Sequence, residues 1–262
     1  MFYTSICMDY MKQYMKSRMI YRTDFLVDFF SNLLNQCINL LFIFIVFAKV
    51  PTLSGWSREE IVFIYGYFLI PYAIFDTFWG NLWNVQDRYI IKGEMDRILT
   101  RPVYSLFQIL LETMTLESLS GVITGIAVMV YSGNQLHLSF QWYDSFVLLL
   151  LVLGSNFVYG GIYVTLASIG FWTDSKTGII PLIYNIGSYG RYPVDIYNKA
   201  IRALLTWVLP FAFVGVYPAM YFLHKPGYLL WTILTPIVGA IAMTIGIFVW
   251  NAGIKRYRGA GS

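Results

Sequence analysis

The side chains most often used in protein chemistry are few in this sequence and lie far apart. The two histidines, His137 and His224, are widely separated, and Cys7 and Cys37 lack the spacing of a metal site or a disulfide framework. The sequence contains no H-E-x-x-H zinc motif, no G-x-S-x-G nucleophile elbow and no G-x-x-x-x-G-K-[ST] phosphate loop. We therefore expect no catalytic residues, no metal site and no ATP site in this chain, and we predict that it is not itself an enzyme.

One group of polar residues follows a helical period inside an apolar stretch. Asp28, Asn32, Asn35 and Asn39 are separated by four, three and four residues, which places them on one helical face. Polar side chains are costly in lipid, so this face should point toward protein or water. It lines a translocation path or a dimer interface, or it provides hydrogen bonds between helices, each worth roughly 1 kcal/mol.

Three further acidic residues also fall in apolar stretches: Asp76, Glu112 and Glu117. They are too few and too scattered to form a proton relay. We expect each of them to be exposed to water or paired.

The most densely charged stretch runs from Asp87 to Pro102 and ends in an Arg-Pro break, a probable helix boundary. Its length and charge are typical of a surface helix that docks onto a soluble partner. The alternative is a solvated loop whose cations only set the topology.

The elements that position these residues are long and apolar. The chain is 58% hydrophobic and 12% charged, whereas soluble domains carry about 25% charged residues. About 20 apolar residues are needed for a helix to cross a membrane. Six stretches meet this requirement: Phe25–Ala48, Ile61–Trp83, Leu106–Tyr131, Ser145–Phe171, Ala203–Leu223 and Tyr228–Trp250.

The basic residues indicate the orientation of these six stretches, because cytoplasmic loops are enriched in Lys and Arg. With this span assignment, 15 of the 18 basic residues fall on one side, and only Lys49, Arg58 and Lys225 fall on the other. We therefore predict an all-α membrane protein with six transmembrane helices and both termini in the cytoplasm. The cations are spread over four clusters, so the net charge of +4 does not indicate a nucleic-acid partner.

The N-terminal stretch, Met1 to Thr23, mixes cations with Tyr, Met and Ile and has no apolar core or cleavage site. We expect residues 1–24 to form an amphipathic helix at the cytoplasmic membrane interface, the alternative being a solvated leader. Residues 25–252 would then form the transmembrane domain, with an inner loop at 84–104, and residues 253–262 a cytoplasmic tail. A capping box of Ser57 and Glu60 predicts a helix start after the first outer turn.

Several motifs, taken in order, resemble the permeases of type-2 ABC exporters. The first is Gly93-Glu94-Met95-Asp96 followed by Ile98 to Pro102. The second is Tyr192-Pro193 with Ile196-Tyr197, ahead of Leu209-Pro210 and Tyr217-Pro218. The third runs from Trp250-Asn251 through Lys255-Arg256-Tyr257 to the closing Gly-Ala-Gly-Ser. With six spans and inward termini, the resemblance covers nearly the whole chain.

The resemblance implies partners and a coupling site. Such permeases pair with themselves or with a sister permease in the bacterial cytoplasmic membrane, and a separate ATP-binding cassette subunit binds ATP and Mg. A coupling helix between the second and third spans docks into that subunit. By position it would run from Arg88 to Arg101 here. The residues expected to carry the coupling are Arg88, Glu94, Asp96, Arg97, Arg101 and Pro102.

The resemblance also favours a second placement of the fifth span. Many relatives carry re-entrant helices on the outer face between spans five and six. Accordingly, Thr173–Tyr189 would be a short fifth span and Arg191–Leu223 the outer re-entrant element. This placement moves Arg191, Lys199 and Arg202 outside, so that the basic residues divide 12 against 6. Both placements keep six spans and inward termini.

The function expected from the resemblance is export of an amphiphilic cargo, such as a peptide, a drug or a lipid-linked molecule, driven by the ATPase partner. The alternative is a secondary transporter or channel that works alone. The sequence offers no inverted repeat with interrupted helices in support of that alternative.

Overall fold

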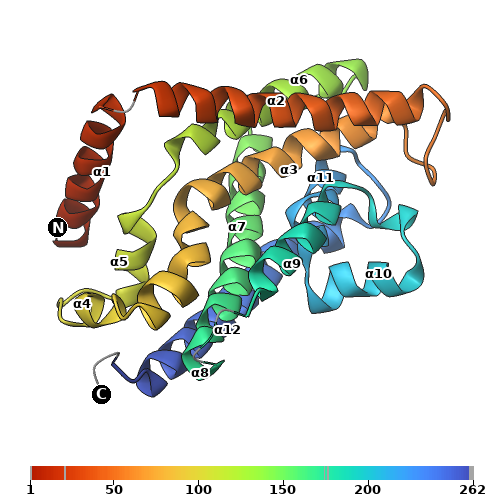
Figure 1. The fold of residues 1–262 in the computed structure, drawn as a ribbon. Helices are drawn as coiled ribbons and strands as arrows, with labels where there is room; N and C mark the ends of the chain where they lie inside the picture. Colours follow the sequence, from red (N-terminus) through yellow and green to blue (C-terminus); the bar gives the residue numbers. More distant parts are fainter. Residues whose placement is uncertain (1, 21, 174, 176, 260–262) are drawn as a thin grey trace.

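The computed structural model describes residues 2–20, 22–173, 175 and 177–259, and this part of the chain is helical (Figure 1). The one extended pairing among these residues is an isolated bridge between Leu53 and Trp56. The α-helices are α1 (Phe2–Ile20), α2 (Arg22–Phe47), α3 (Arg58–Trp79), α4 (Met95–Leu99), α5 (Ser105–Glu112), α6 (Ser120–Gln135), α7 (Asp144–Ser168), α8 (Gly170–Thr173), α9 (Ile179–Gly187), α10 (Lys199–Ala203), α11 (Val216–Phe222) and α12 (Tyr228–Arg256).

Five described helical stretches are long and apolar enough to cross a membrane. They are Arg22–Phe47, Arg58–Ile91, Leu116–Gln135, Asp144–Thr173 and Tyr228–Arg256. The chain is therefore a multi-pass membrane protein by the length and apolar character of its helices.

Helix α3 is the centre of the bundle, because every residue from Ile61 to Pro71 is buried. We name the two ends of the bundle after nearby residues. The Trp56 end is the one where α3 begins, and the Arg88 end is the one that the chain reaches after α3 ends at Trp79. Relative to α3, helices α2 and α6 run antiparallel and α7 runs parallel. For α2, the contacts that fix the direction are Tyr65 with Gln36 and Arg58 with Phe44. For α6, they are Gly66 with Met129 and Gly121 with Ala73. For α7, they are Tyr67 with Ser155 and Gln86 with Leu166.

Helices α7 and α12 run parallel to each other in very close contact. Gly154 and Gly161 of α7 meet Gly239 and Gly246 of α12, so both helices present glycines seven residues apart. Further along, Gly253 packs on Phe171. Small residues allow helix backbones to approach closely, as is common in membranes. Because the contacts advance together along both helices, α12 ends at the same end of the bundle as α7.

The chain must therefore return from the Arg88 end to the Trp56 end between α7 and α12, and residues 177–195 make this return. At the Arg88 end, the backbone N–H of Thr177 donates to Oε1 of Gln86 (3.1 Å). Midway, Tyr184 hydrogen-bonds Tyr72 of α3. At the other end, Nε1 of Trp56 donates to Oδ2 of Asp195 (3.3 Å). Helix α9 and the 3₁₀ turn Ser188–Arg191 thus run antiparallel to α3.

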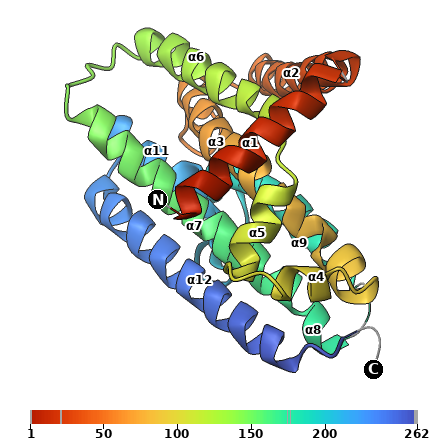
Figure 2. The same cartoon turned by 90° about the vertical axis from the view of Figure 1, so that its left-hand side faces the viewer.

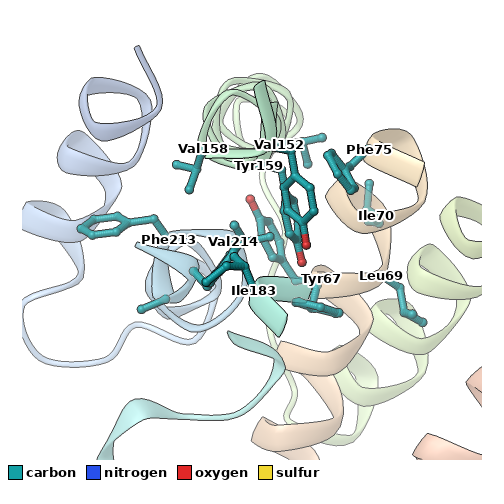
Figure 3. Packing of buried hydrophobic residues seen from close by; sticks show 14 of the residues in the cluster. Tyr67, Leu69, Ile70, Phe75, Val152, Val158, Tyr159, Ile183, Phe213 and Val214 are labelled. Carbon is teal, nitrogen blue, oxygen red and sulfur yellow. The ribbon is translucent and has the colours of Figure 1, made fainter. Parts of the chain in front are cut away.

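The core lies where α3, α7, α9 and the 3₁₀ turn Phe211–Val214 meet (Figure 3). Tyr159 of α7 stacks on Phe75 of α3 with the ring centroids 4.7 Å apart. It also contacts Phe211, at 5.6 Å. Aromatic side chains from distant segments therefore fill the centre of the bundle.

The predicted third span, Leu106–Tyr131, is not one helix, and that prediction is wrong as a continuous element. Helix α5 ends at Glu112, and the chain is extended at Thr113 before a 3₁₀ turn, Leu116–Leu119, leads into α6. Hydrogen bonds to α3 satisfy this break. The hydroxyls of Thr115 and Ser118 donate to the backbone and side-chain oxygens of Asp76, at 2.8 and 2.5 Å. Asp76 is therefore hydrogen-bonded and half-buried.

The predicted fifth span, Ala203–Leu223, is also wrong as a continuous helix. Helix α10 passes into a π-helical turn, Leu204–Val208, which ends before Pro210. The proline has no N–H to donate, so a helix cannot continue through it unbroken. The 3₁₀ turn Phe211–Val214 and α11 follow. The structure favours the second placement, because residues 177–195, rather than Ala203–Leu223, run back along the length of the bundle.

The cations of this region accordingly lie away from the Arg88 end, contrary to the first placement. Arg191 bonds Asn39 in the half of α2 that approaches the Trp56 end. Arg202 pairs with Asp195 at 2.9 Å, and Asp195 bonds Trp56. Counted by sequence position, the basic residues divide 12 against 6 between the two ends.

The capping box at the start of α3 is confirmed. The backbone N–H of Glu60 donates to Oγ of Ser57, and that of Ser57 donates to Oε2 of Glu60. Residues 2–20 are helical, as predicted for the N-terminal segment. Figure 2 shows α1 crossing in front of α3, at an angle to α2.

The contact between α7 and α12 predicts a sensitive glycine. A methyl group on Gly161 would overlap the backbone of Ala242. We expect Gly161→Ala to destabilise the fold by about 1–3 kcal/mol, through overpacking. The thermal unfolding midpoint of the purified protein should fall by roughly 2–10 °C. Gly80→Ala is the control, since a methyl group there meets open space; equal midpoints for the two variants would contradict the close packing.

Candidate functional site

The charged stretch at the Arg88 end folds into two short helical pieces. A π-helical turn, Val85–Ile91, continues α3, and α4 follows. Between them Gly93 has a φ of 77°, a left-handed conformation that favours glycine. Gln108 of α5 holds the far side, because its Nε2 donates to the carbonyls of Ile98 (3.3 Å) and Val103 (2.7 Å). The glycine turn and the glutamine together fix α4 against the bundle.

Ion pairs connect α4 to both flanking elements. Arg97 donates two hydrogen bonds to Glu112 of α5, at 2.7 and 2.9 Å, and lies 3.4 Å from Glu94. Arg88 pairs with Glu94 at 2.9 Å. Tyr89 also donates to Glu112, at 2.7 Å. Two-pronged Arg–carboxylate pairs are among the stronger and more directional polar contacts. Displacement of α4 would therefore act directly on α5 and on the end of α3.

These contacts shift the acidity of both carboxyl groups. Hydrogen bonding from Arg88 is the main cause that lowers the pKa of Glu94. Burial alone would raise the pKa of Glu112, but hydrogen bonds from Arg97 and Tyr89 outweigh burial and lower it. Both groups are thus held in the charged form that the ion pairs require.

Helix α1 closes one side of this region and leaves a groove of about 810 Å³. Nη1 of Arg101 donates to the hydroxyl of Tyr10 (3.1 Å), and the hydroxyl of Tyr14 donates to Glu117 (2.8 Å). The lining residues carry charges of both signs, among them acidic Asp9 and Glu112 and basic Arg101.

Helix α4 has one buried and one exposed side. Met95 and Ile98 are fully buried against the bundle. Asp96 and Leu99 are exposed, and Leu99 has 42% of its surface accessible. Helix α4 thus exposes Leu99 beside charged groups, while Met95 and Ile98 anchor the helix to the bundle.

A second candidate site lies between α2, α3, α7 and α9, and we call it the α2 cleft. It has a volume of about 290 Å³. Amides, tyrosine rings and one cation surround it. The lining residues are Asn32, Asn35, Gln36, Asn39, Tyr65, Phe68, Leu69, Tyr72, Tyr159, Tyr163, Tyr184, Asn185, Ser188 and Arg191.

The structure brings most of the residues singled out in the sequence into these two sites. Arg88, Glu94, Arg97, Arg101 and Pro102 line the groove, whereas Asp96 lies on the outward side of α4. Asn32, Asn35 and Asn39 line the α2 cleft, and Asp28 is exposed outside it.

Sequence reasoning missed the residues that other elements contribute. The sequence analysis singled out Glu112 but did not identify Arg97 as its partner. It treated Arg191 only as a cation between helices and not as part of a cleft. The contribution of α1 to the groove was missed as well, although Tyr10 and Tyr14 are four residues apart and so share a helical face.

The alternating helices, the charged groove and the polar cleft define a multi-pass helical membrane protein. Residues 33–261 match the family model described as ABC-2 family transporter protein, and the chain belongs to this family. It is therefore a type-2 ABC permease, the membrane component of a transport system, a class that in general works with an ATP-binding cassette partner. No curated protein and no solved structure matches the chain.

The lowered pKa values predict how the α4–α5 contact responds to pH. We expect Glu112→Gln to lower the unfolding free energy at pH 7 by about 1–2 kcal/mol, because Arg97 loses a charged partner. A lowered pKa contributes stability above the unfolded-state pKa of about 4.3, and this is lost as pH falls through the folded value. The difference between the native protein and the variant should therefore shrink between pH 4.5 and pH 3.

Thermal unfolding at pH 7 and at pH 3 tests this expectation. The control is Asp9→Asn, which removes an exposed contact with Lys12 at 4.0 Å and should change little. A Glu112→Gln difference that is absent at pH 7, or equally large at both pH values, would show that the pair does not stabilise the region.

Proposed function

We propose that this chain is the permease of an ATP-driven exporter that crosses the membrane six times and keeps both termini in the cytoplasm. In this topology α2, α3, α6, α7, the α9 segment and α12 are the six crossings. The Arg88 end is cytoplasmic, α1 lies at the inner membrane interface, and residues 191–227 form a re-entrant cap on the outer side.

Two observations support this topology. The passes alternate in direction through the bundle, with α7 and α12 parallel and the α9 segment returning between them. By sequence position, 12 of the 18 basic residues belong to the Arg88 end, which follows the bias of cytoplasmic loops. The α9 helix is only nine residues long, and the turn that follows completes its pass.

The functional proposal rests on the way in which α4 is attached to the rest of the bundle. Helix α4 presents Asp96 and Leu99 outward, and Arg97 holds it to Glu112 of α5. A partner that presses on its exposed side would move α5 and the end of α3 together. Since the chain breaks at Thr113 between α5 and α6, α5 can tilt without carrying α6 rigidly. Movement of an ATP-binding subunit would thus become a change in helix packing.

The proposed exporter is a pair of permeases, identical or sister chains, each with an ATP-binding subunit that binds ATP and Mg. Helices α2 and α12 present long apolar faces, which provide surface for lipid and for the second permease. The cargo would be amphiphilic and would leave through the region lined by the polar face of α2.

The proposal predicts that the exposed side of α4 is required for the ATPase partner. We expect Leu99→Glu combined with Asp96→Lys to reduce co-purification of an ATP-binding cassette subunit by about tenfold or more, because central interface residues dominate affinity. The thermal midpoint of the permease should remain unchanged, since neither side chain is buried. The measurement is quantitative mass spectrometry of the complex purified from its native membrane.

Lys199→Glu is the matched control, since it changes the charge of an exposed residue on the re-entrant cap. Full retention of the ATP-binding subunit by the α4 variant would contradict the proposed coupling site. Transport by the purified chain alone in liposomes, driven by an ion gradient, would instead support a secondary transporter.

A further inference from the structure

Arg191 in the α2 cleft has only neutral partners. Its Nη1 donates to Oδ1 of Asn39 (2.6 Å), and its Nε donates to the carbonyl of Ser188 (2.9 Å). The guanidinium also lies 5.6 Å from the centroid of the Tyr192 ring. Among the residues that the structure describes, no carboxylate forms an ion pair with Arg191. The positive charge of the cleft is therefore not neutralised within the chain.

Three of the five other cations toward the Trp56 end have acidic partners, and the remaining two, Lys49 and Lys199, are exposed. The three pairs are Arg58 with Glu59 at 2.7 Å, Arg202 with Asp195 at 2.9 Å and Lys225 with Glu60 at 2.7 Å. These pairs lie on loops and helix starts, where water is also close. Arg191 differs from them both in its position inside the bundle and in its lack of an acidic partner.

The depth of Arg191 makes this charge significant. Asn39, which it contacts, lies eight residues before the end of α2. At 1.5 Å per residue this is about 12 Å along the helix. An unpaired charge within a membrane bundle is unfavourable and typically marks a functional site. The cleft beside Arg191 leaves room for a compensating group.

The rest of the cleft suits the uncharged part of a ligand. Aromatic rings of Tyr72, Tyr159 and Tyr184 form its wall. Among the described residues, no group forms a hydrogen bond with the hydroxyl of Tyr163, a fully buried residue that also lines the cleft, or with Oε1 of Gln36. Unsatisfied buried polar atoms are rare in folded proteins and here remain available to a bound molecule.

We propose that the α2 cleft binds an anionic amphiphile, whose carboxylate or phosphate pairs with Arg191 and whose apolar part lies along the tyrosine wall. This inference rests on the proposed exporter function and narrows the class of its cargo. The cleft volume of about 290 Å³ is close to the lower end for small-molecule sites. It would accommodate the head and the first part of the chain, while the remainder extends into lipid.

Binding of a matched pair of probes tests this assignment. The probes are 11-(dansylamino)undecanoate and the neutral 11-(dansylamino)undecanol, titrated by fluorescence into the full-length protein in phosphatidylcholine nanodiscs, with the signal of empty nanodiscs subtracted. We expect the carboxylate probe to bind at least about tenfold more tightly than the alcohol, because a charge-assisted hydrogen bond strengthens only its binding. Arg191→Gln should remove this preference, and Arg191→Lys should retain part of it.

Arg202→Gln is the matched control and should leave the preference unchanged. Equal affinity of the two probes for the native protein, or an undiminished preference in Arg191→Gln, would overturn the proposal. If Arg191→Gln does not fold, competition on the native protein decides: dodecyl phosphate should displace the carboxylate probe, and dodecanol should not. Equal displacement by both would equally overturn it.

A second set of nanodiscs separates two sources of the anionic group. Displacement of the probe by phosphatidylglycerol would assign the site to a membrane lipid headgroup, and no displacement would assign it to another anionic amphiphile. These titrations use no nucleotide and no ATPase subunit. A negative result in these titrations would not affect the proposed coupling role of α4. Evidence against that coupling role would likewise not affect the binding result.

Discussion

The parallel contact between α7 and α12 is the constraint on which the architecture depends. Glycines at Gly154, Gly161, Gly239 and Gly246 bring the two backbones so close that neither direction nor register can change without disrupting the contact. Two helices that run the same way through a bundle require a return pass between them. The short α9 segment supplies this pass, although its length alone would not identify it as a membrane crossing.

Lipid as solvent explains why the interruptions are built as they are. Backbone polar groups cannot be left unpaired in hydrocarbon, so a broken helix is tolerated only where protein satisfies it. The break between α5 and α6 meets this requirement through Thr115 and Ser118, which bond Asp76 of α3. The same break separates α5, which is joined to α4, from α6, which packs on α3. The pair α4 and α5 is thereby separated from the packed centre of the bundle.

The sequence was sufficient to predict the helical class, the long apolar helices and the start of α3, because apolar length and capping chemistry are local properties. Five of the six residues predicted to carry the coupling line one groove in the structure, and their role in coupling stays a prediction. Hydropathy could not reveal the break at Thr113, because the hydrogen bonds that stabilise it come from distant Asp76. The first span assignment placed Arg191, Lys199 and Arg202 at the Arg88 end, because charge counting alone does not detect the return pass made by residues 177–195.

In the proposed topology the chain crosses the membrane between Thr177 and Asp195. Single cysteines at Leu99 and at Lys199, in a background with Cys7→Ser and Cys37→Ser, test it most directly with a membrane-impermeant maleimide on intact cells. We expect the cysteine at 199 to be labelled from outside and the cysteine at 99 to be labelled only after the membrane is permeabilised. Labelling of both positions from the same side would contradict it.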